Sequence, residues 1–316
     1  MRYARIIGTG SFLPEKTVTN DDLAQILDTS DQWISSRTGI RKRRISTDEV
    51  TSDLATKAGE KALKDAGLEA KDIDLIICAT ITPETFMPSV ACVVQDRLGA
   101  YQAAAFDLSA ACTGMIYAMV VGQQFIENGI YKNVLIIGAE TLSKVLDWND
   151  RSTCVLFGDG AGAVILSASQ EKRGIVASQL MADGSKKDLL VCNALPSLDN
   201  AGKITMEGHE VFKYAVRTIT DNIKSILDKA GLDSEDINYV IPHQANQRII
   251  ELAAKYCDIA IEKFYINLDR YGNTSAASIG IALDEMIKEK KPQVGDKIIL
   301  VGFGGGMTSG ATLIIW

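Results

Sequence analysis

One pattern of apolar and polar positions occurs twice along the chain. Residues 61–77 (KALKDAGLEAKDIDLII) and residues 225–241 (SILDKAGLDSEDINYVI) match at seven positions in a single register. Each copy has the pattern of the end of an amphipathic helix, a glycine that closes it, an acidic turn and an apolar strand. Chance similarity between two ordinary helix–turn–strand units is the alternative, but seven matches in one register favour an internal repeat.

Further similarities follow both copies in the same order. Residues 104–126 and 264–287 each have the pattern of a strand, a short loop and a helix. Later apolar segments are also alike: NVLIIG (133–138) and AGAVILS (161–167) resemble KIILVG (297–302) and ATLIIW (311–316). Repeated helix–strand units with apolar strands indicate buried sheets flanked by helices, which is an α/β fold. We therefore predict two similar halves, residues 1–170 and 171–316, joined at the polar turn 170–174.

Composition and charge restrict the class of protein. The formal net charge of −7 argues against broad nucleic-acid binding. The six cysteines are scattered, with no C-x-x-C pair and no metal-like Cys/His cluster, so we expect a reduced, cytoplasmic compartment and no metal. The N-terminal apolar stretch is too short for a signal peptide, and no apolar run approaches the ~20 residues of a membrane span.

Cys112 is the first candidate for chemistry. It lies among small residues in FDLSAACTG (106–114), between a predicted strand and a predicted amphipathic helix. A helix N-terminus lowers the pKa of a thiol and favours the thiolate, which is the nucleophilic form. A buried structural cysteine is the alternative, and the five other cysteines have contexts that favour it.

His243 and Asn273 are the second and third candidates. His243, one of only two histidines with His209, follows an apolar strand in VIPHQANQR (240–248), and the end of a strand is the usual place for sites in α/β sheets. Asn273 in GNTSAAS (272–278) stands in the second half roughly where Cys112 stands in the first. A satisfied core histidine and an ordinary turn asparagine are the alternatives. Together the thiol, imidazole and carboxamide suffice for acyl transfer through a thioester, at a site between the halves.

The glycine-rich segment GFGGGMTSG (302–310) is not a dinucleotide loop, because a strand rather than a helix follows it. Its glycines let the backbone approach a ligand closely, so that exposed N–H groups could bind an oxyanion. A hairpin turn is the alternative.

Taken together, these motifs resemble the β-ketoacyl-[acyl-carrier-protein] synthase III family, the initiating condensing enzymes of type II fatty-acid synthesis. The resemblance covers essentially the whole chain and includes GTGSFLP (8–14), TNDDL (19–23), DTSDQWISSRTGIRKRR (28–44), FDLSAACTG, DWNDRST (147–153), FGDGAGA (157–163), HQAN (243–246), GNTSAAS and FGGG (303–306). It implies the thiolase fold, with two related halves in a five-layered α-β-α-β-α arrangement, usually as a homodimer. It also implies decarboxylative condensation of a short acyl-CoA, such as acetyl-CoA, with malonyl-acyl-carrier protein, without a metal or redox cofactor.

The resemblance also assigns roles to residues. Cys112 would accept the acyl group, His243 and Asn273 would act in decarboxylation, and the backbone N–H groups of Cys112 and Gly306 would form an oxyanion hole. The residues that match coenzyme A contacts are Thr29, Trp33, Arg37, Arg151, Phe212, Ala245 and Asn246. Trp33 and Arg151 match the pair around the adenine, and Arg37 matches an arginine near the phosphates.

A basic rim is expected to bind the carrier protein, which is itself acidic. Lys213 and Arg217 are four apart on one predicted helix, and Arg248 and Lys255 are seven apart on the helix after His243, so each pair shares a face. Gln244 is placed in the same docking set. Solvated surface charges are the alternative.

Two residues depart from some relatives. Met87 stands where some have phenylalanine at the end of the primer pocket, and Ser309 stands where some have tryptophan. Both leave the length of the primer chain open.

Three alternative functions are considered. A polyketide-type or alkylquinolone-type synthase of the same superfamily could keep the same three residues and change the primer or the extender. A cysteine hydrolase could also use Cys, His and Asn, but it would not explain the repeat. A non-catalytic acyl-CoA-binding protein would not need Cys112.

Overall fold

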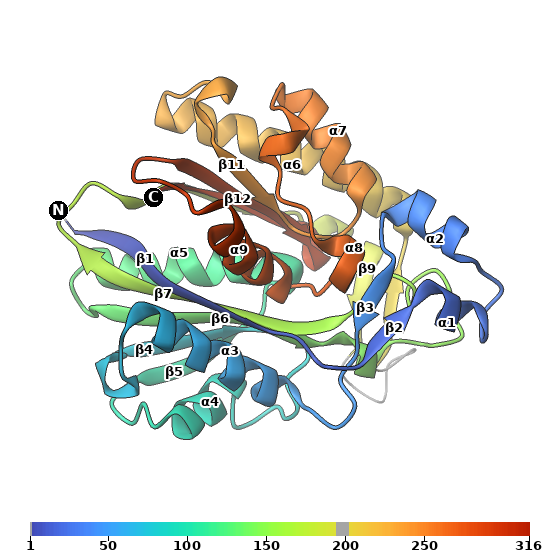
Figure 1. The fold of residues 1–316 in the computed structure, drawn as a ribbon, viewed down its shortest axis with the longest axis horizontal. Helices are drawn as coiled ribbons and strands as arrows, with labels where there is room; N and C mark the ends of the chain where they lie inside the picture. Colours follow the sequence, from blue (N-terminus) through green and yellow to red (C-terminus); the bar gives the residue numbers. More distant parts are fainter. Residues whose placement is uncertain (1, 194–201) are drawn as a thin grey trace.

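The computed structural model describes residues 2–193 and 202–316, and its core is two stacked sheets (Figure 1). The first sheet has five strands, in the spatial order β1 (Tyr3–Phe12), β7 (Asp159–Ser169), β6 (Asn133–Thr141), β4 (Leu75–Ala79) and β5 (Ala104–Leu108). Strand β4 is parallel to both β5 and β6, whereas β7 is antiparallel to β6 and to β1.

The second sheet repeats this order. Its four strands are β11 (Tyr239–Pro242), β12 (Lys297–Gly304), β13 (Thr308–Ile315) and β8 (Gly174–Ala182), with β11 parallel to β12 and the other pairs antiparallel. The strand predicted to begin at Phe264 is reduced to a single bridge between Phe264 and Val240, where β5 lies in the first sheet. Two small sheets pair β2 (Thr17–Thr19) with β3 (Lys42–Arg44) and β9 (Leu190–Cys192) with β10 (Ile204–Met206).

Helices cover both sheets in layers. Helices α3 (Thr51–Ala66) and α4 (Val90–Leu98) cover the outer face of the first sheet, and α6 (Gly208–Ala230) and α7 (Gln247–Cys257) cover the outer face of the second. Between the sheets lie α5 (Gly114–Glu127) and α9 (Ala277–Lys290) (Figure 1). The predicted α-β-α-β-α arrangement is confirmed. The short helices are α1 (Asn20–Ala24), α2 (Asp31–Thr38) and α8 (Leu268–Tyr271).

The repeated sequence pattern forms the same local structure twice. Helix α3 ends at Gly67 with φ +65°, and α6 ends at Gly231 with φ +64°. This left-handed conformation costs glycine no strain. One turn of 3₁₀ helix then leads into β4 in the first copy and into β11 in the second.

Helix α9 packs directly on the backbone of the first sheet. A Cβ atom on Gly162 of β7 would lie 2.4 Å from the carbonyl carbon of Gly280, and one on Gly138 of β6 would lie 2.2 Å from the carbonyl oxygen of Ala276. Only glycine allows such an approach. The contact fixes the position of the segment before α9, which carries Asn273, relative to the first sheet.

Candidate active site

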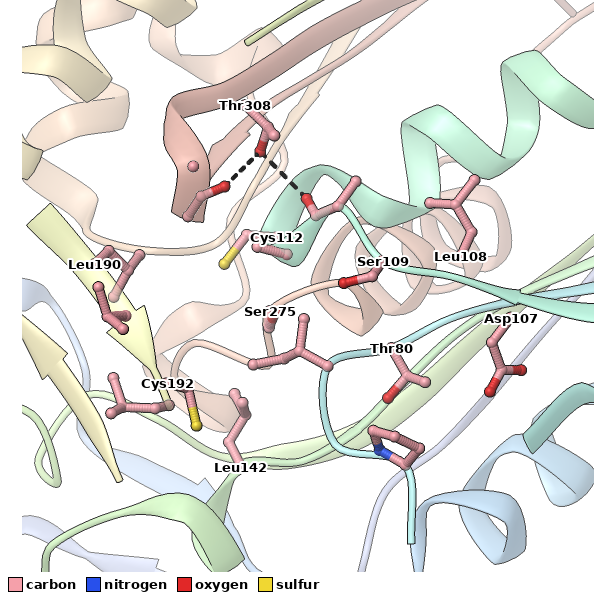
Figure 2. Close-up of a pocket in the computed structure, with 18 of the residues that line it drawn as sticks. Thr80, Asp107, Leu108, Ser109, Cys112, Leu142, Leu190, Cys192, Ser275 and Thr308 are labelled. Atoms are coloured by element: carbon pink, nitrogen blue, oxygen red, sulfur yellow. Dashed lines mark hydrogen bonds between the residues drawn. The ribbon is translucent and has the colours of Figure 1, made fainter. Parts of the chain in front are cut away.

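Cys112 lies where the chain turns from β5 into α5. It is the second residue of a 3₁₀ turn, Ala111–Thr113, that leads into the helix, and Ala111 adopts φ +46° at this corner. A residue at this position has a backbone N–H group that its own helix cannot use. The sulfur faces a cavity, although Cys112 is only 6% exposed (Figure 2).

The acidity of this thiol differs from our expectation. Burial raises the pKa of Cys112 to about 12. The predicted lowering of the Cys112 pKa is therefore wrong for this structure, because burial disfavours the charged thiolate. The resting residue is a thiol that must lose a proton when it attacks.

His243 follows the last residue of β11, and its backbone N–H donates to the carbonyl oxygen of Val301 at 2.8 Å. The side chain is 1% exposed, and burial lowers the pKa of His243 to about 3, so the ring is neutral. Its Nδ1 lies 2.7 Å from the hydroxyl of Ser278, which also accepts from the Gln244 N–H at 3.4 Å. Since that hydroxyl already accepts once, its own proton is available for Nδ1. This arrangement favours the tautomer with the proton on Nε2.

Asn273 is held by the first half of the chain. Its backbone N–H donates to Leu156 at 2.8 Å, and its carbonyl accepts from Gly158 at 3.0 Å. The side-chain Oδ1 accepts from the backbone N–H of Ser275 at 2.8 Å. With Oδ1 used in this way, the Nδ2 amide is the group that remains to donate toward a ligand.

The structure brings these three residues together. Cys112, His243 and Asn273 line one small cavity of about 80 Å³, next to Phe303, whose ring meets the imidazole edge-on at 5.3 Å. Cys112 also lines a larger cavity of about 690 Å³, together with Ser275, Leu142 and Thr308 (Figure 2). The thiol therefore lies at the junction of two cavities.

The glycine-rich segment packs against the amide of Cys112. A Cβ on Gly304 would lie 2.7 Å from that nitrogen, and Gly306 has φ +71° in the turn Gly305–Met307. Thr308 anchors the turn: its hydroxyl donates to Gly305 or Ala110, at 3.1 and 3.2 Å (Figure 2). This segment joins the antiparallel strands β12 and β13. It therefore also forms the hairpin turn that was the alternative to an oxyanion-binding segment.

The expected coenzyme A residues form two groups. In the first, the guanidinium carbons of Arg37 and Arg151 lie 4.6 and 5.1 Å from the centre of the Trp33 ring, and Arg151 pairs with Asp28 at 3.5 Å. In the second, Phe212, Ala245 and Asn246 line the small cavity beside His243.

Asn246 and Thr29 also belong to this expected coenzyme A region. The amide of Asn246 donates to the carbonyl of Arg37 at 3.0 Å and so joins the groups through α2 and α7. The hydroxyl oxygen of Thr29 is buried and has no hydrogen-bond partner among the described residues.

Only some of the basic residues that we expect to bind the carrier protein lie in one groove. Lys213 and Arg217 line a groove of about 550 Å³ between α6 and α7, with Lys224, which the sequence analysis did not select. Lys213 pairs with Glu210 at 3.0 Å and Arg217 with Asp221 at 3.5 Å. The guanidinium of Arg248 lies 5.7 Å from the Phe212 ring. Lys255 does not join this groove and lines a separate hollow beside Glu235 and Lys263.

The assignment of Gln244 to the docking set is wrong. The side chain is 1% exposed, and its Nε2 donates to Pro242 at 2.8 Å and to Tyr265 at 3.1 Å. Its Oε1 accepts from the Asn267 N–H at 3.0 Å. Gln244 therefore joins buried backbone segments beneath His243 and cannot touch a docked protein.

Met87 and Ser309, the two residues that leave the primer length open, do not line the cavities beside Cys112. Met87 is 86% exposed and is not among the residues that line the larger cavity. Ser309 is buried in β13, where its hydroxyl accepts from Asn222 of α6 at 3.3 Å. The larger cavity is lined instead by residues including Leu142, Leu190 and Ile204.

The sequence analysis did not select Ser278, Ser275 or Glu140. Ser278 lies at the end of the GNTSAAS motif, and a serine five positions after a candidate asparagine is a weak signal. Glu140 is a completely buried acid that follows the apolar run VLIIGA in β6, and that context is the only signal the sequence offers for it. Within the described ranges, no group of His, Cys, Asp or Glu could hold a metal, and no helix is long and apolar enough to cross a membrane.

Comparison with known proteins identifies the family. The family model for 3-oxoacyl-[acyl-carrier-protein (ACP)] synthase III matches residues 106–184, and the model for its C-terminal part matches residues 227–316. The chain is 53% identical to beta-ketoacyl-[acyl-carrier-protein] synthase III of Clostridium acetobutylicum over 324 residues, which covers 100% of this chain and 99% of the relative.

Solved structures agree. The crystal structure of 3-oxoacyl-[acyl-carrier-protein] synthase III from Aquifex aeolicus has a TM-score of 0.96 at 50% identity, covering 99% of this chain and 100% of that one. The priming β-ketosynthase from the R1128 polyketide biosynthetic pathway has a TM-score of 0.94 at 32% identity, covering 99% and 96%. The resemblance read from the motifs is thus confirmed, and the chain belongs to the 3-oxoacyl-[acyl-carrier-protein] synthase III family of thiolase-fold condensing enzymes.

Proposed function

We propose that this protein condenses a short acyl-CoA primer, acetyl-CoA first of all, with malonyl-acyl-carrier protein. The products are 3-oxoacyl-acyl-carrier protein, CoA and CO₂, and the reaction initiates fatty-acid synthesis. The observation that carries the proposal is the convergence of Cys112, neutral His243 and Asn273 on one cavity. These groups need no metal or redox cofactor for this reaction.

In the first half-reaction, Cys112 attacks the thioester of the primer and becomes acylated while CoA leaves. The thioester oxygen gains negative charge during the attack. The backbone N–H groups of Cys112 and Gly306 are the donors that we assign to this oxyanion. Their closeness is supported by the contact of Gly304 with the Cys112 amide.

Coenzyme A would reach Cys112 along the two groups of residues described above. The Trp33 ring can stack on the adenine beside Arg151, and Arg37 can pair with the phosphates. The pantetheine arm would pass Thr29, Phe212, Ala245 and Asn246. Support for this path comes from the bond between Asn246 and Arg37 and from the small cavity that Phe212, Ala245 and Asn246 share with Cys112.

In the second half-reaction, malonyl-acyl-carrier protein loses CO₂ and the resulting enolate attacks the acyl-cysteine. We assign His243 Nε2–H and Asn273 Nδ2–H as donors to the thioester oxygen of the malonyl group, where charge develops. A neutral imidazole with its proton on Nε2 is the form that this role needs. Both the lowered pKa of His243 and its contact with Ser278 support that form.

The carrier protein would dock on the groove between α6 and α7. Lys213, Arg217 and Arg248 provide positive charge around it for an acidic partner. Gln244 takes no part, and Lys255 lies outside the groove.

We further propose a cytoplasmic homodimer built from two such chains, each with halves 1–170 and 171–316. The exposed side chains of Phe86 and Met87 are apolar surface that a second copy could cover. Because Met87 does not line the cavity of its own chain, it could limit a primer pocket only from a second copy.

A second candidate is the same reaction with a longer or branched primer, as in polyketide priming. The observation that favours it is the larger cavity beside Cys112, whose volume of about 690 Å³ exceeds the needs of an acetyl group.

The experiment incubates the protein with radiolabelled acetyl-CoA, maps the labelled peptide, and then repeats the assay with a panel of longer and branched acyl-CoAs. Label should appear on Cys112 alone and disappear in Cys112→Ser. Label on another cysteine, or none with any acyl-CoA, would exclude the proposed function. Preference for a longer primer would select the second candidate.

A further inference from the structure

Glu285 is a charged residue of α9 that the proposed mechanism does not use. Its side chain is 17% exposed, and its carboxylate faces the segment that precedes Asn273. Oε2 accepts from Asn267 Nδ2 at 2.8 Å and from Arg270 Nη2 at 2.9 Å, and Oε1 accepts from the Tyr271 hydroxyl at 2.5 Å. One carboxylate therefore holds three side chains of the segment that leads to Asn273.

Gln244 holds the same segment, residues 265–271, from another element. Its Oε1 accepts from the backbone N–H of Asn267 at 3.0 Å, and its Nε2 donates to the carbonyl of Tyr265 at 3.1 Å. Asn267 is 2% exposed, and it is bound through its backbone to Gln244 and through its side chain to α9. The segment thus connects the residue after His243 to helix α9.

Helix α9 supports both His243 and Asn273. Ser278 and Glu285 are seven residues apart, which places them two turns apart on one face of this helix. Ser278 contacts His243 Nδ1 at 2.7 Å, and Glu285 holds the segment before Asn273. The close backbone contact of α9 with the glycines of β6 and β7 does not involve Glu285. Loss of the carboxylate should therefore release the segment while α9 stays in place.

The partners of Glu285 lie outside the cavities where chemistry would occur. Among the described residues that line the two cavities beside Cys112, none donates a hydrogen bond to Glu285. Burial raises the pKa of Tyr271 to about 12, so its phenol remains protonated and can donate to the carboxylate. Glu285 can therefore influence a reaction only through the residues whose positions it fixes.

We propose that Glu285 is a positioning residue for decarboxylation, which keeps Asn273 beside His243 by holding the preceding segment against α9. The inference rests on the proposed function, in which Asn273 and His243 donate to the thioester oxygen of the malonyl group. Acylation of Cys112 needs neither donor. The role of Glu285 therefore belongs to the second half-reaction alone.

The test compares the two half-reactions in the full-length wild type and in Glu285→Ala. Labelled acetyl-CoA measures acylation in a single turnover, and labelled CO₂ released from malonyl-acyl-carrier protein by the acylated enzyme measures decarboxylation. Glu285→Ala should release CO₂ on the order of 10²-fold more slowly, because a displacement of about 1 Å at the reacting groups costs this much. Acylation should keep the wild-type rate. The KM for malonyl-acyl-carrier protein should also be unchanged, since the proposed docking groove lies between α6 and α7.

Asp284→Ala is the matched control on the same helix. The residue Asp284 is 1% exposed and accepts from the hydroxyl of Thr9 at 2.8 Å and from that of Ser11 at 2.6 Å. It therefore joins α9 to β1 rather than to the segment before Asn273. Its loss should lower the free energy of unfolding, measured by urea denaturation, while the ratio of the two half-reaction rates stays at the wild-type value.

A double variant shows whether Glu285 acts through Asn273. Adding Glu285→Ala to Asn273→Ala should slow CO₂ release little further, because both changes remove the same donor from its place. Glu285→Gln keeps the size of the side chain and one acceptor oxygen, so it tests the same role if the alanine variant does not fold. It should show the same selective loss to a smaller degree.

The outcomes are distinguishable. If the wild type is not acylated or releases no CO₂, the proposed function fails, and the inference fails with it. If the wild type performs both steps but Glu285→Ala and Glu285→Gln retain the rate of CO₂ release, the positioning role is wrong. Equal slowing of both half-reactions, or the same selective loss in Asp284→Ala, would show a general structural effect and overturn it. Full additivity with Asn273→Ala would also overturn it, because Glu285 would then act through another residue.

Discussion

Replacing Gly162 by alanine should disturb the site from a distance. The new Cβ would lie 2.4 Å from the carbonyl carbon of Gly280 and 2.5 Å from the nitrogen of Ile281. All of these are backbone atoms inside regular elements, so no flexible side chain can move aside. To reach an ordinary van der Waals contact, β7 and α9 must separate by roughly 1 Å. Overpacking of this kind costs about 1–3 kcal/mol, and we expect the upper end because backbone is displaced.

The displaced helix carries the candidate site. Asn273 and Ser275 lie just before the N-terminus of α9, whereas Cys112 lies just before the N-terminus of α5. A shift of about 1 Å between reacting groups can cost on the order of 10²-fold in rate. Gly162→Ala should therefore lower the rate of condensation about 100-fold and lower the free energy of unfolding by about 3 kcal/mol. Urea denaturation and release of labelled CO₂ measure the two effects.

Gly59→Ala is the matched control. Its Cβ would meet side-chain carbons of Leu135 and Leu98 at 3.4 Å, which is an ordinary contact, and it lies inside helix α3. Alanine there should leave the rate unchanged and stabilise by up to about 1 kcal/mol. If Gly162→Ala unfolds within about 0.5 kcal/mol of the wild type and keeps its rate, the close packing does not position the site.

Three other tests address separate parts of the molecule. His243→Ala and Asn273→Ala should still accept acetyl on Cys112 but release CO₂ roughly 10²–10³-fold more slowly, about 2.7–4 kcal/mol for each lost donor; equal loss in both half-reactions would contradict the division of roles. The pKa of Glu140 is raised from 4.5 to about 7, so its stabilising contribution is complete below pH 4.5 and is lost as the pH rises through 7. Glu140→Gln should therefore gain about 3 kcal/mol relative to the wild type between pH 4.5 and pH 8.5, measured by urea denaturation, and an unchanged difference would refute the buried charge. Reversing Lys213 and Arg248 to Glu should raise KM for malonyl-acyl-carrier protein and weaken its salt dependence without slowing acylation by acetyl-CoA; equal effects on both substrates would place docking elsewhere.

Local rules of sequence predicted much of the fold. Gly67 and Gly231 end their helices as the repeated pattern predicts. The left-handed residue after a helix depends mainly on the neighbouring residues of the sequence. Cys112 follows β5 and His243 follows β11, and both positions after a strand could be predicted from the order of apolar and small residues. By contrast, Phe264 makes only one bridge because its pairing depends on a distant edge strand.

Burial and long-range contacts could not be predicted in the same way. The raised pKa of the Cys112 thiol arises from burial, whereas the neighbouring residues in the sequence suggest the opposite shift. Gln244 follows His243 in a surface-like motif, yet its amide is enclosed by backbone groups of a later segment. Glu140 accepts a hydrogen bond from Thr82, 58 positions earlier in the chain, and only the pairing of β6 with β4 brings these two segments together.

The Trp33 ring is in contact with two guanidinium groups, so any flat molecule that stacks on it competes with cations of the protein itself. Each such contact is worth about 0.5–1 kcal/mol at an exposed site. A neutral heteroaromatic molecule that displaced an arginine from Trp33 would remove this interaction and form no ion pair with that arginine in its place. A nucleotide brings phosphates that can pair with the same guanidinium. Stacking on Trp33 should therefore favour flat ligands that carry negative charge over neutral ones.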